Sequence, residues 1–169
     1  MLPMDRELVC MAMRPDLLAV GSHSHIMLLD PRQPCMLVKV VESLDACQGV
    51  RSLCFQEDLI SCGSGRGRLF FYDLRTNAYM PLREDIRDLT EEDPKQFKGQ
   101  REQLSPREYL QLGKGWLCTE DDIYQQLFTH ERIYNACYAH AWDPTQTKLM
   151  CVGGPLAFGL KGCYLGLWH

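Results

Sequence analysis

The 169-residue sequence contains no apolar run near twenty residues in length. A helix needs about twenty such residues to cross the hydrocarbon core of a bilayer, so the sequence excludes a membrane-spanning helix. The N-terminal residues 1–16 also lack the hydrophobic region of a signal peptide, because charged side chains interrupt their short apolar pieces (Asp5, Arg6, Glu7 and Arg14). We therefore expect a soluble, intracellular protein with no membrane partner.

Cys-x-x-Cys spacing is absent, although the sequence contains nine cysteines. The five histidines fall at no metal-ligand spacing to them. Most cysteines lie instead within apolar runs, as in Leu53-Cys54-Phe55 and Met150-Cys151-Val152. Reduced, buried cysteines that behave as small hydrophobic residues fit this pattern better than a disulfide framework or a zinc site. We expect no metal and no other cofactor.

An excess of basic residues is absent as well, since the formal net charge is -4. Domains that bind nucleic acid without sequence preference usually carry a basic surface that neutralises phosphates. The charge therefore argues against a nucleic-acid partner.

Motifs of the common enzyme classes are also missing. The sequence has no G-x-S-x-G and no H-E-x-x-H motif, and the lysine of Gly113-Lys114-Gly115 does not have the spacing of a P-loop. The acidic run Glu120-Asp121-Asp122 resembles a catalytic cluster, but the first turn of a helix also favours negative charge. We expect no catalytic residue, and the sequence gives little support to a hydrolase or a transferase.

What the sequence does contain is an internal repeat. Two copies share one order: an apolar strand, a second strand, a polar turn and a third strand that ends in Asp-x-Arg. The first copy has these parts at residues 8–13, 17–21, 22–24 and 25–32, and the second has them at 50–55, 59–63, 64–67 and 68–75. Short apolar strands separated by Gly, Ser and Asp turns predict the antiparallel blades of a β-propeller.

A third unit occupies the C-terminal residues, with strands expected at 136–142, 148–152 and 163–168. No fourth strand follows before His169. We therefore predict an all-β fold, a partial β-propeller of about three blades whose last blade lacks its outer strand. In domain terms, residues 1–82 form two blades, residues 83–132 an insertion and residues 133–169 the incomplete third blade.

The insertion is charged and is expected to be partly helical. Ser105-Pro106-Arg107-Glu108 has the residue types of a helix start. Thr119-Glu120-Asp121-Asp122 begins a second expected helix of about ten residues, with one apolar face (Ile123, Tyr124, Leu127 and Phe128). Residues 83–104 show no such pattern, and we expect them to be disordered.

The third unit resembles the C-terminus of one family of WD-repeat proteins, that of DDB- and cullin-4-associated factor 12. The resemblance rests on Tyr138-Ala139-His140-Ala141-Trp142-Asp143-Pro144, on Val152-Gly153-Gly154-Pro155-Leu156 and on residues 159–168, with further matches at residues 29–34 and 113–117. It runs from Glu7 to Trp168, is weakest in the insertion, and covers only the C-terminal part of the family's propeller.

This resemblance implies a non-catalytic substrate receptor of a cullin-4 ubiquitin ligase, present in cytoplasm and nucleus. Such a receptor docks on the DNA-damage-binding adaptor of the ligase and recognises proteins with acidic C-termini, here tails that end in two Glu residues (a C-degron). The implied partners are thus the adaptor and substrate proteins.

The adaptor-binding residues implied are Asp30, Arg32, Asp73 and Arg75. Asp30-Pro31-Arg32 and Asp73-Leu74-Arg75 end the third strands of the first two blades, in the position where WD repeats carry Trp-Asp. The third strand of a WD blade runs towards the bottom face, and a guanidinium there offers planar donors to carboxylate or carbonyl groups of a partner. The alternative is a structural Asp followed by a solvent-facing Arg.

A rim of basic residues is expected on the opposite, top face. Arg51 opens an innermost strand, and four further residues lie in or beside the turns between second and third strands (His23, His25, Arg66 and Arg68). Basic groups that converge near a propeller channel favour a peptide with a terminal carboxylate and acidic side chains. A solvated turn remains the alternative for Arg66 and Arg68.

A second function remains open beside the receptor. Three blades leave open sheet edges, whereas propellers usually close with four to eight blades. The chain could therefore be a fragment or a truncated isoform, a decoy interaction module that does not recruit a ligase.

Overall fold

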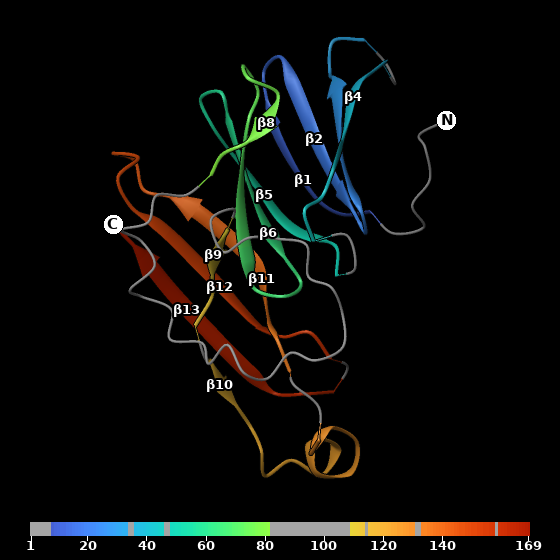
Figure 1. Ribbon diagram of the computed structural model, residues 1–169, viewed down its shortest axis with the longest axis vertical. Coiled ribbons are helices and arrows are strands. Elements are labelled where there is room, and N and C mark those ends of the chain that lie inside the picture. The colour runs from blue at the N-terminus through green and yellow to red at the C-terminus, as the bar shows by residue number, and fades with distance from the viewer. Residues whose placement is uncertain are drawn as a thin grey trace.

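The computed structural model describes residues 8–33, 36–45, 48–81, 109–113, 115–130, 133–157 and 159–169. Over these residues the chain forms three antiparallel sheets that stand side by side (Figure 1). This arrangement confirms the predicted all-β fold with the blades of a partial propeller.

The first blade has the strand order β1-β2-β3-β4. Its strands are β1 (Leu8–Arg14), β2 (Leu17–Ser22), β3 (His25–Asp30) and β4 (Met36–Glu42). The first three agree with the strands expected from the repeat, and β4 is the outer strand. The polar turns at Pro15-Asp16 and at His23-Ser24 separate them.

The second blade has the order β5-β6-β7-β8. Its strands are β5 (Val50–Gln56), β6 (Leu59–Ser64), β7 (Arg68–Asp73) and β8 (Ala78–Tyr79). A further strand, β9 (Leu110–Gln111), also pairs with β7: Arg68 and Leu69 lie opposite β9, and Tyr72 and Asp73 lie opposite β8. The outer strand of this blade therefore consists of two short pieces from distant parts of the chain.

The third blade has the order β10-β13-β12-β11. Its strands are β10 (Trp116–Leu117), β11 (Asn135–Trp142), β12 (Leu149–Pro155) and β13 (Gly162–Trp168). The expectation that this blade lacks an outer strand therefore needs a correction. Trp116 and Leu117 pair with Cys163 and Gly162, so the chain that precedes β11 supplies a short outer strand.

The expected insertion, residues 83–132, thus contributes strands to two blades. Beyond β10, Asp122 and Ile123 begin a helical segment that continues as the π-helix η2 (Tyr124–Phe128). This segment is shorter than the helix expected there, and none of its residues is buried in the core. The helix start expected at residues 105–108 and the disorder expected for 83–104 lie outside the described residues.

Two apolar cores hold the blades together. The first lies between the first and second blades and includes Ile26, Leu28, Ile60, Phe70 and Tyr72. The second lies between the second and third blades and includes Leu69, Phe71, Cys137, Leu149 and Cys151. Because side chains alternate along a strand, β7 serves both cores and is buried throughout. This position explains its continuous apolar sequence, Leu69-Phe70-Phe71-Tyr72.

The inner strands β1, β5 and β11 lie next to one another. Each has a register shift near its beginning. In the second blade a small residue, Ser52, faces Gly63 there, and a Cβ on Gly63 would collide with the Ser52 hydroxyl and the Cys137 sulfur. Glycine at this position therefore lets the second and third blades approach closely.

Among the described residues, no helix is long and apolar enough to cross a membrane.

Candidate functional site

Each blade has two ends, because neighbouring strands run in opposite directions. The top face carries the beginnings of β1, β5 and β11 and the turns that join β2 to β3, β6 to β7 and β12 to β13. The bottom face carries the turns that join β1 to β2, β5 to β6 and β11 to β12, together with the ends of β3 and β7. In Figure 1 the bottom face lies at the upper end, near the label β8.

Two residues of the expected basic rim meet on the top face. Gly49, in the loop before β5, has a left-handed backbone with φ of 75°. A Cβ at Gly49 would lie 3.5 Å from Nε and Nη2 of Arg51 and 3.5 Å from the Cα of His23. Arg51 Nε also donates to the backbone carbonyl of Gln48 at 3.1 Å. The loop thus holds the Arg51 guanidinium beside the first blade's β2–β3 turn, where His23 is exposed.

His25 lies at the beginning of β3 on the same face. Its ring Nδ1 is 2.6 Å from the Ser24 hydroxyl, and its side chain is half-buried. It therefore lies on the top face as expected, with one ring nitrogen engaged by its neighbour.

Arg66 is engaged inside the protein. Its Nε lies 3.8 Å from Oδ1 of Asp45, and its guanidinium lies 5.8 Å from the centre of the Tyr134 ring. Asp45 is itself buried and accepts a hydrogen bond from the Ser64 hydroxyl at 2.8 Å. These contacts favour a structural role for Arg66, joining the β6–β7 turn to the loops on either side.

Arg68 does not lie on the surface of the rim. Only 5% of the residue is exposed, and its guanidinium lies 4.5 Å from the centre of the Tyr109 ring. The pairing of β9 with β7 brings Tyr109 over it, which the sequence of the repeat alone could not indicate. The basic rim therefore includes fewer than the five residues expected, and Arg51 and His23 lie at its centre.

The bottom face presents the second expected pair, Asp73 and Arg75. The Asp73 carboxylate accepts the backbone N–H of Arg75 at 2.8 Å and that of Thr76 at 3.4 Å, and Nη2 of Arg75 lies 3.5 Å from it. These donors, the Arg75 N–H foremost, lower the pKa of Asp73. The Arg75 side chain is 74% exposed, so Asp73 orders the turn while the guanidinium faces solvent.

The first blade repeats this arrangement with Asp30 and Arg32. The Asp30 carboxylate accepts Nε, Nη2 and the backbone N–H of Arg32, each at 2.9 Å. The side-chain hydrogen bonds are the main reason why the pKa of Asp30 is lowered and that of Arg32 raised. Arg32 is thus more fully occupied by its own aspartate than Arg75 is.

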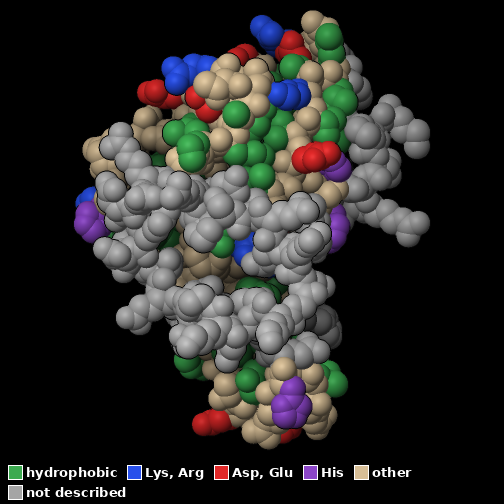
Figure 2. Space-filling model, viewed as in Figure 1, with side chains coloured by type: hydrophobic (Ala, Val, Ile, Leu, Met, Phe, Trp, Pro, Cys, Tyr) green, Lys and Arg blue, Asp and Glu red, His purple; other side chains and the backbone are tan. Residues whose placement is uncertain are grey.

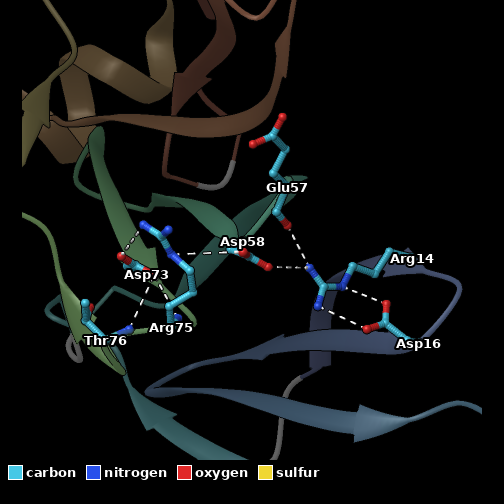
Figure 3. Close-up of polar contacts among 7 residues, drawn as sticks. All are labelled: Arg14, Asp16, Glu57, Asp58, Asp73, Arg75 and Thr76. Carbon is cyan, nitrogen blue, oxygen red and sulfur yellow. Dashed lines mark hydrogen bonds and ion pairs between the residues drawn. The ribbon is translucent and has the colours of Figure 1, made fainter.

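Asp58 and Arg14, neither of which was expected to be a site residue, connect the bottom ends of the first and second blades. Asp58, in the β5–β6 turn, lies between Arg14 and Arg75: Oδ1 is 3.6 Å from Arg14 Nη1, and Oδ2 is 4.0 Å from Arg75 Nε (Figure 3). Figure 2 shows positive and negative side chains gathered at this end of the molecule. In the sequence, only the position of Arg14 directly before the Pro15-Asp16 turn indicated that its side chain lies at this end of the blade.

A buried polar network lies where the second and third blades meet. The His140 ring is held from both sides, with Nδ1 2.7 Å from the Ser52 hydroxyl and Nε2 2.8 Å from the Ser61 hydroxyl. Trp142 Nε1 also donates to the Ser61 oxygen at 3.3 Å. All three members of the Ser52-His140-Ser61 arrangement are buried, and both hydroxyls lie within hydrogen-bond distance of the imidazole ring. The network satisfies polar groups between two sheets.

The described cysteines have free thiols: Cys62, Cys137 and Cys151 are buried, Cys163 is exposed, and the others are half-buried. Within the described part of the chain, no group of three or more His, Cys, Asp or Glu side chains is arranged to hold a metal ion. Asp121, from the acidic run, accepts the backbone N–H of Ile123 at 3.1 Å and pairs with Lys161 at 2.7 Å. Its carboxylate therefore lies just before the helical segment, whereas the π-helix η2 itself has no acidic residue in its first turn.

Comparison with known protein families matches residues 1–169 to the family model described as DDB1- and CUL4-associated factor 12 beta propeller. The matched range includes all three blades and both faces described above. With three propeller blades and a family match over its full length, the chain belongs to the DDB1- and CUL4-associated factor 12 β-propeller family.

Proposed function

We propose that this protein is a substrate-receptor module of a cullin-4 ubiquitin ligase, non-catalytic in itself, that joins the ligase adaptor to substrate proteins. The family name supports association with DDB1 and CUL4. The observation that carries the proposal is the exposed guanidinium of Arg75, which Asp73 holds at the end of β7 on the bottom face. A planar, exposed donor group on an ordered turn suits carboxylate or carbonyl acceptors of a partner.

We further propose that the top face binds acidic C-terminal tails. Arg51 and His23 support this part, because both lie at the opposite end of the blades from Arg75. A substrate bound there does not compete with an adaptor bound to the bottom face. In this proposal Arg66 and Arg68 support the top-face turns and do not form the main contacts with the tail. Their guanidinium groups engage Asp45, Tyr134 and Tyr109 inside the protein.

A capture experiment with purified DDB1 tests the adaptor contact. We expect Arg75→Ala to weaken adaptor binding by about tenfold or more, since hot-spot arginines at interfaces typically contribute about 2 kcal/mol. Arg51→Glu, a change on the other face, is expected to leave adaptor binding unaltered. If the wild-type chain does not capture DDB1, or if both variants bind equally well, the docking proposal fails.

A peptide titration tests substrate binding separately. The wild-type chain should bind a peptide ending in two Glu residues more tightly than the same peptide with an amidated C-terminus, because charge-assisted hydrogen bonds to the terminal carboxylate are lost. Arg51→Glu should abolish this binding, with Arg75→Ala as the matched control. Equal affinity for the two peptides would remove the carboxylate from the mechanism.

The alternative is a decoy module that binds tails without recruiting a ligase. Binding of the acidic peptide without capture of DDB1 would favour this alternative over the receptor. The expected sites of action for the receptor are the cytoplasm and the nucleus, where fluorescence microscopy of the tagged protein can test the assignment.

A further inference from the structure

Two cysteines of the third blade lie in direct contact. Cys137, on β11, and Cys151, on β12, both point towards the second blade and are fully buried. Their sulfur atoms are 2.8 Å apart. A disulfide bond measures about 2.05 Å, so a small movement brings these atoms to bonding distance. The two residues are diagonal neighbours on adjacent strands, two positions apart on β12: Cys137 pairs with Gly153, and Cys151 pairs with His140.

The surroundings of Cys137 are polar. Its sulfur lies 3.3 Å from the Ser52 hydroxyl and 3.9 Å from Nδ1 of His140. Hydrogen bonding from the Cys151 thiol is the main cause that lowers the pKa of Cys137, and His140 acts in the same direction. The pKa of Cys151 is raised, by its hydrogen bond with Cys137 and by burial. Because the Ser52 hydroxyl and the His140 ring lie beside its sulfur, Cys137 is the better placed of the two to react as a thiolate.

Two other cysteines nearby, the half-buried Cys10 and the buried Cys62, lack these features. Burial raises the pKa of Cys10 to about 11 and raises that of Cys62 as well. Cys10 donates a weak hydrogen bond to the Val50 carbonyl. Reactive cysteines are those with thiolate character, whereas buried thiols in apolar surroundings are inert. Cys10 and Cys62, which belong to the neighbouring core between the first and second blades, are therefore natural controls.

From this geometry we propose that Cys137 and Cys151 form a reversible cross-strand disulfide when hydrogen peroxide or a related hydroperoxide oxidises the protein. The Cys137 thiolate attacks one peroxide oxygen, the O–O bond breaks and hydroxide leaves, which gives a sulfenic acid. The Cys151 sulfur then attacks the Cys137 sulfur, the S–O bond breaks, and the hydroxyl leaves with the Cys151 proton as water. A dithiol reductant restores both thiols.

The bond has a defined structural consequence. It ties β11 to β12 near the top face, two residues after Asn135, at the register shift of the inner strand. Gly67, in the β6–β7 turn, packs against the Asn135 carbonyl, and Tyr134 lies against Arg66. Oxidation thus fixes the strand whose beginning supports the top-face loops. This inference does not rest on the proposed function.

The test uses the full chain with Cys163→Ser, which removes an exposed thiol that could link two molecules. The reduced, folded protein is treated with hydrogen peroxide under native conditions, and the remaining thiols are then alkylated. Peptide mapping should find Cys137 joined to Cys151 in the majority of molecules. Treatment with dithiothreitol should return both residues to the alkylatable form. Because both thiols are buried, the reaction should be slower than oxidation of Cys163 in the wild-type chain.

Two further variants are made in the Cys163→Ser protein, which is the parent in this experiment. Cys62→Ala keeps the reactive pair and should form the link as the parent does, whereas Cys151→Ala should not form it. Circular dichroism before and after treatment verifies that the molecule under test is folded. The proposal is overturned if the folded parent protein forms no Cys137–Cys151 link after prolonged exposure, or if the link joins Cys10 or Cys62 instead. Mapping of the parent decides the matter even if Cys151→Ala does not fold.

Discussion

Arg14, at the end of the inner strand of the first blade, donates a hydrogen bond of 2.7 Å to the backbone carbonyl of Glu57 in the second blade. The same guanidinium pairs with Asp16 at 2.8 Å and lies 5.5 Å from the centre of the Phe55 ring. A single side chain thus connects two sheets through a charged donor, an apolar stem and a ring contact.

We predict that Arg14→Met lowers the free energy of unfolding by about 1–2 kcal/mol, because a hydrogen bond from a charged group contributes roughly that amount. Methionine keeps much of the apolar stem and removes the donors. Urea denaturation of both proteins measures the difference. Arg32→Met is the control, since the hydrogen bonds of Arg32 to described residues go to Asp30 in its own turn, and exposed pairs of this kind contribute little to stability. Equal losses in the two variants would contradict a special role for the contact between blades.

We predict a larger loss, about 2–4 kcal/mol, for His140→Ala. This change leaves a cavity and deprives the buried hydroxyls of Ser52 and Ser61 of a partner. A double-mutant cycle supplies the check. In a background that already carries Ser52→Ala, the His140 change should cost less, because one of the two hydroxyls is already gone. Purely additive effects would show that the pair does not interact.

We predict that the hydrogen bonds of Asp143 make the free energy of unfolding depend on pH. Its carboxylate accepts the Thr145 hydroxyl and the backbone N–H groups of Thr147 and Lys148, at 2.8 and 2.7 Å for the latter two. These donors, with Thr145 first, lower its pKa below the ordinary value of 3.8. A lowered folded-state pKa means that the stabilisation is present above that ordinary value and is lost as the pH falls through the folded-state pKa.

Denaturation of the wild type and of Asp143→Ala should therefore differ by a constant amount near neutral pH. The difference should shrink only in acid, below a pH of about 4. Asp16→Ala, in the β1–β2 turn, is a suitable comparison at the same face. A difference that shrinks already between neutral pH and pH 5 would contradict the assignment to Asp143.

We predict that position 67 requires glycine. It has a φ of 70°, and a Cβ there would collide with the Asn135 carbonyl. Gly67→Ala should therefore cost at least about 1–2 kcal/mol, from the left-handed backbone alone. Gly113→Ala is the control, because the nearest atom to a Cβ at Gly113 is Tyr164 Cε2 at 3.8 Å. A control loss as large as that of Gly67→Ala would show that the strain argument is wrong.

The repeat in the sequence predicted the blades well, because alternating strands and Asp, Gly and Ser turns are local signals. The strands β9 and β10 could not be predicted, since two residues carry no periodicity and their pairing partners are distant in sequence. The burial of Arg68 has the same origin, as Tyr109 covers it from outside the repeat. Arg51 and Arg75 could be assigned to opposite ends of a blade because each lies at a fixed place within the repeat, and their binding roles stay predictions.

The two short strands β9 and β10 are separated by only a few residues, yet each completes a different sheet. The two strands therefore join the second blade to the third, because β9 pairs with β7 and β10 pairs with β13. Trimming residues 83–132 as a dispensable surface loop would expose the parts of the outer edges of β7 and β13 that β9 and β10 cover. Unpaired edges of this kind recruit strands from other molecules, so such a deletion should yield aggregates rather than a smaller propeller.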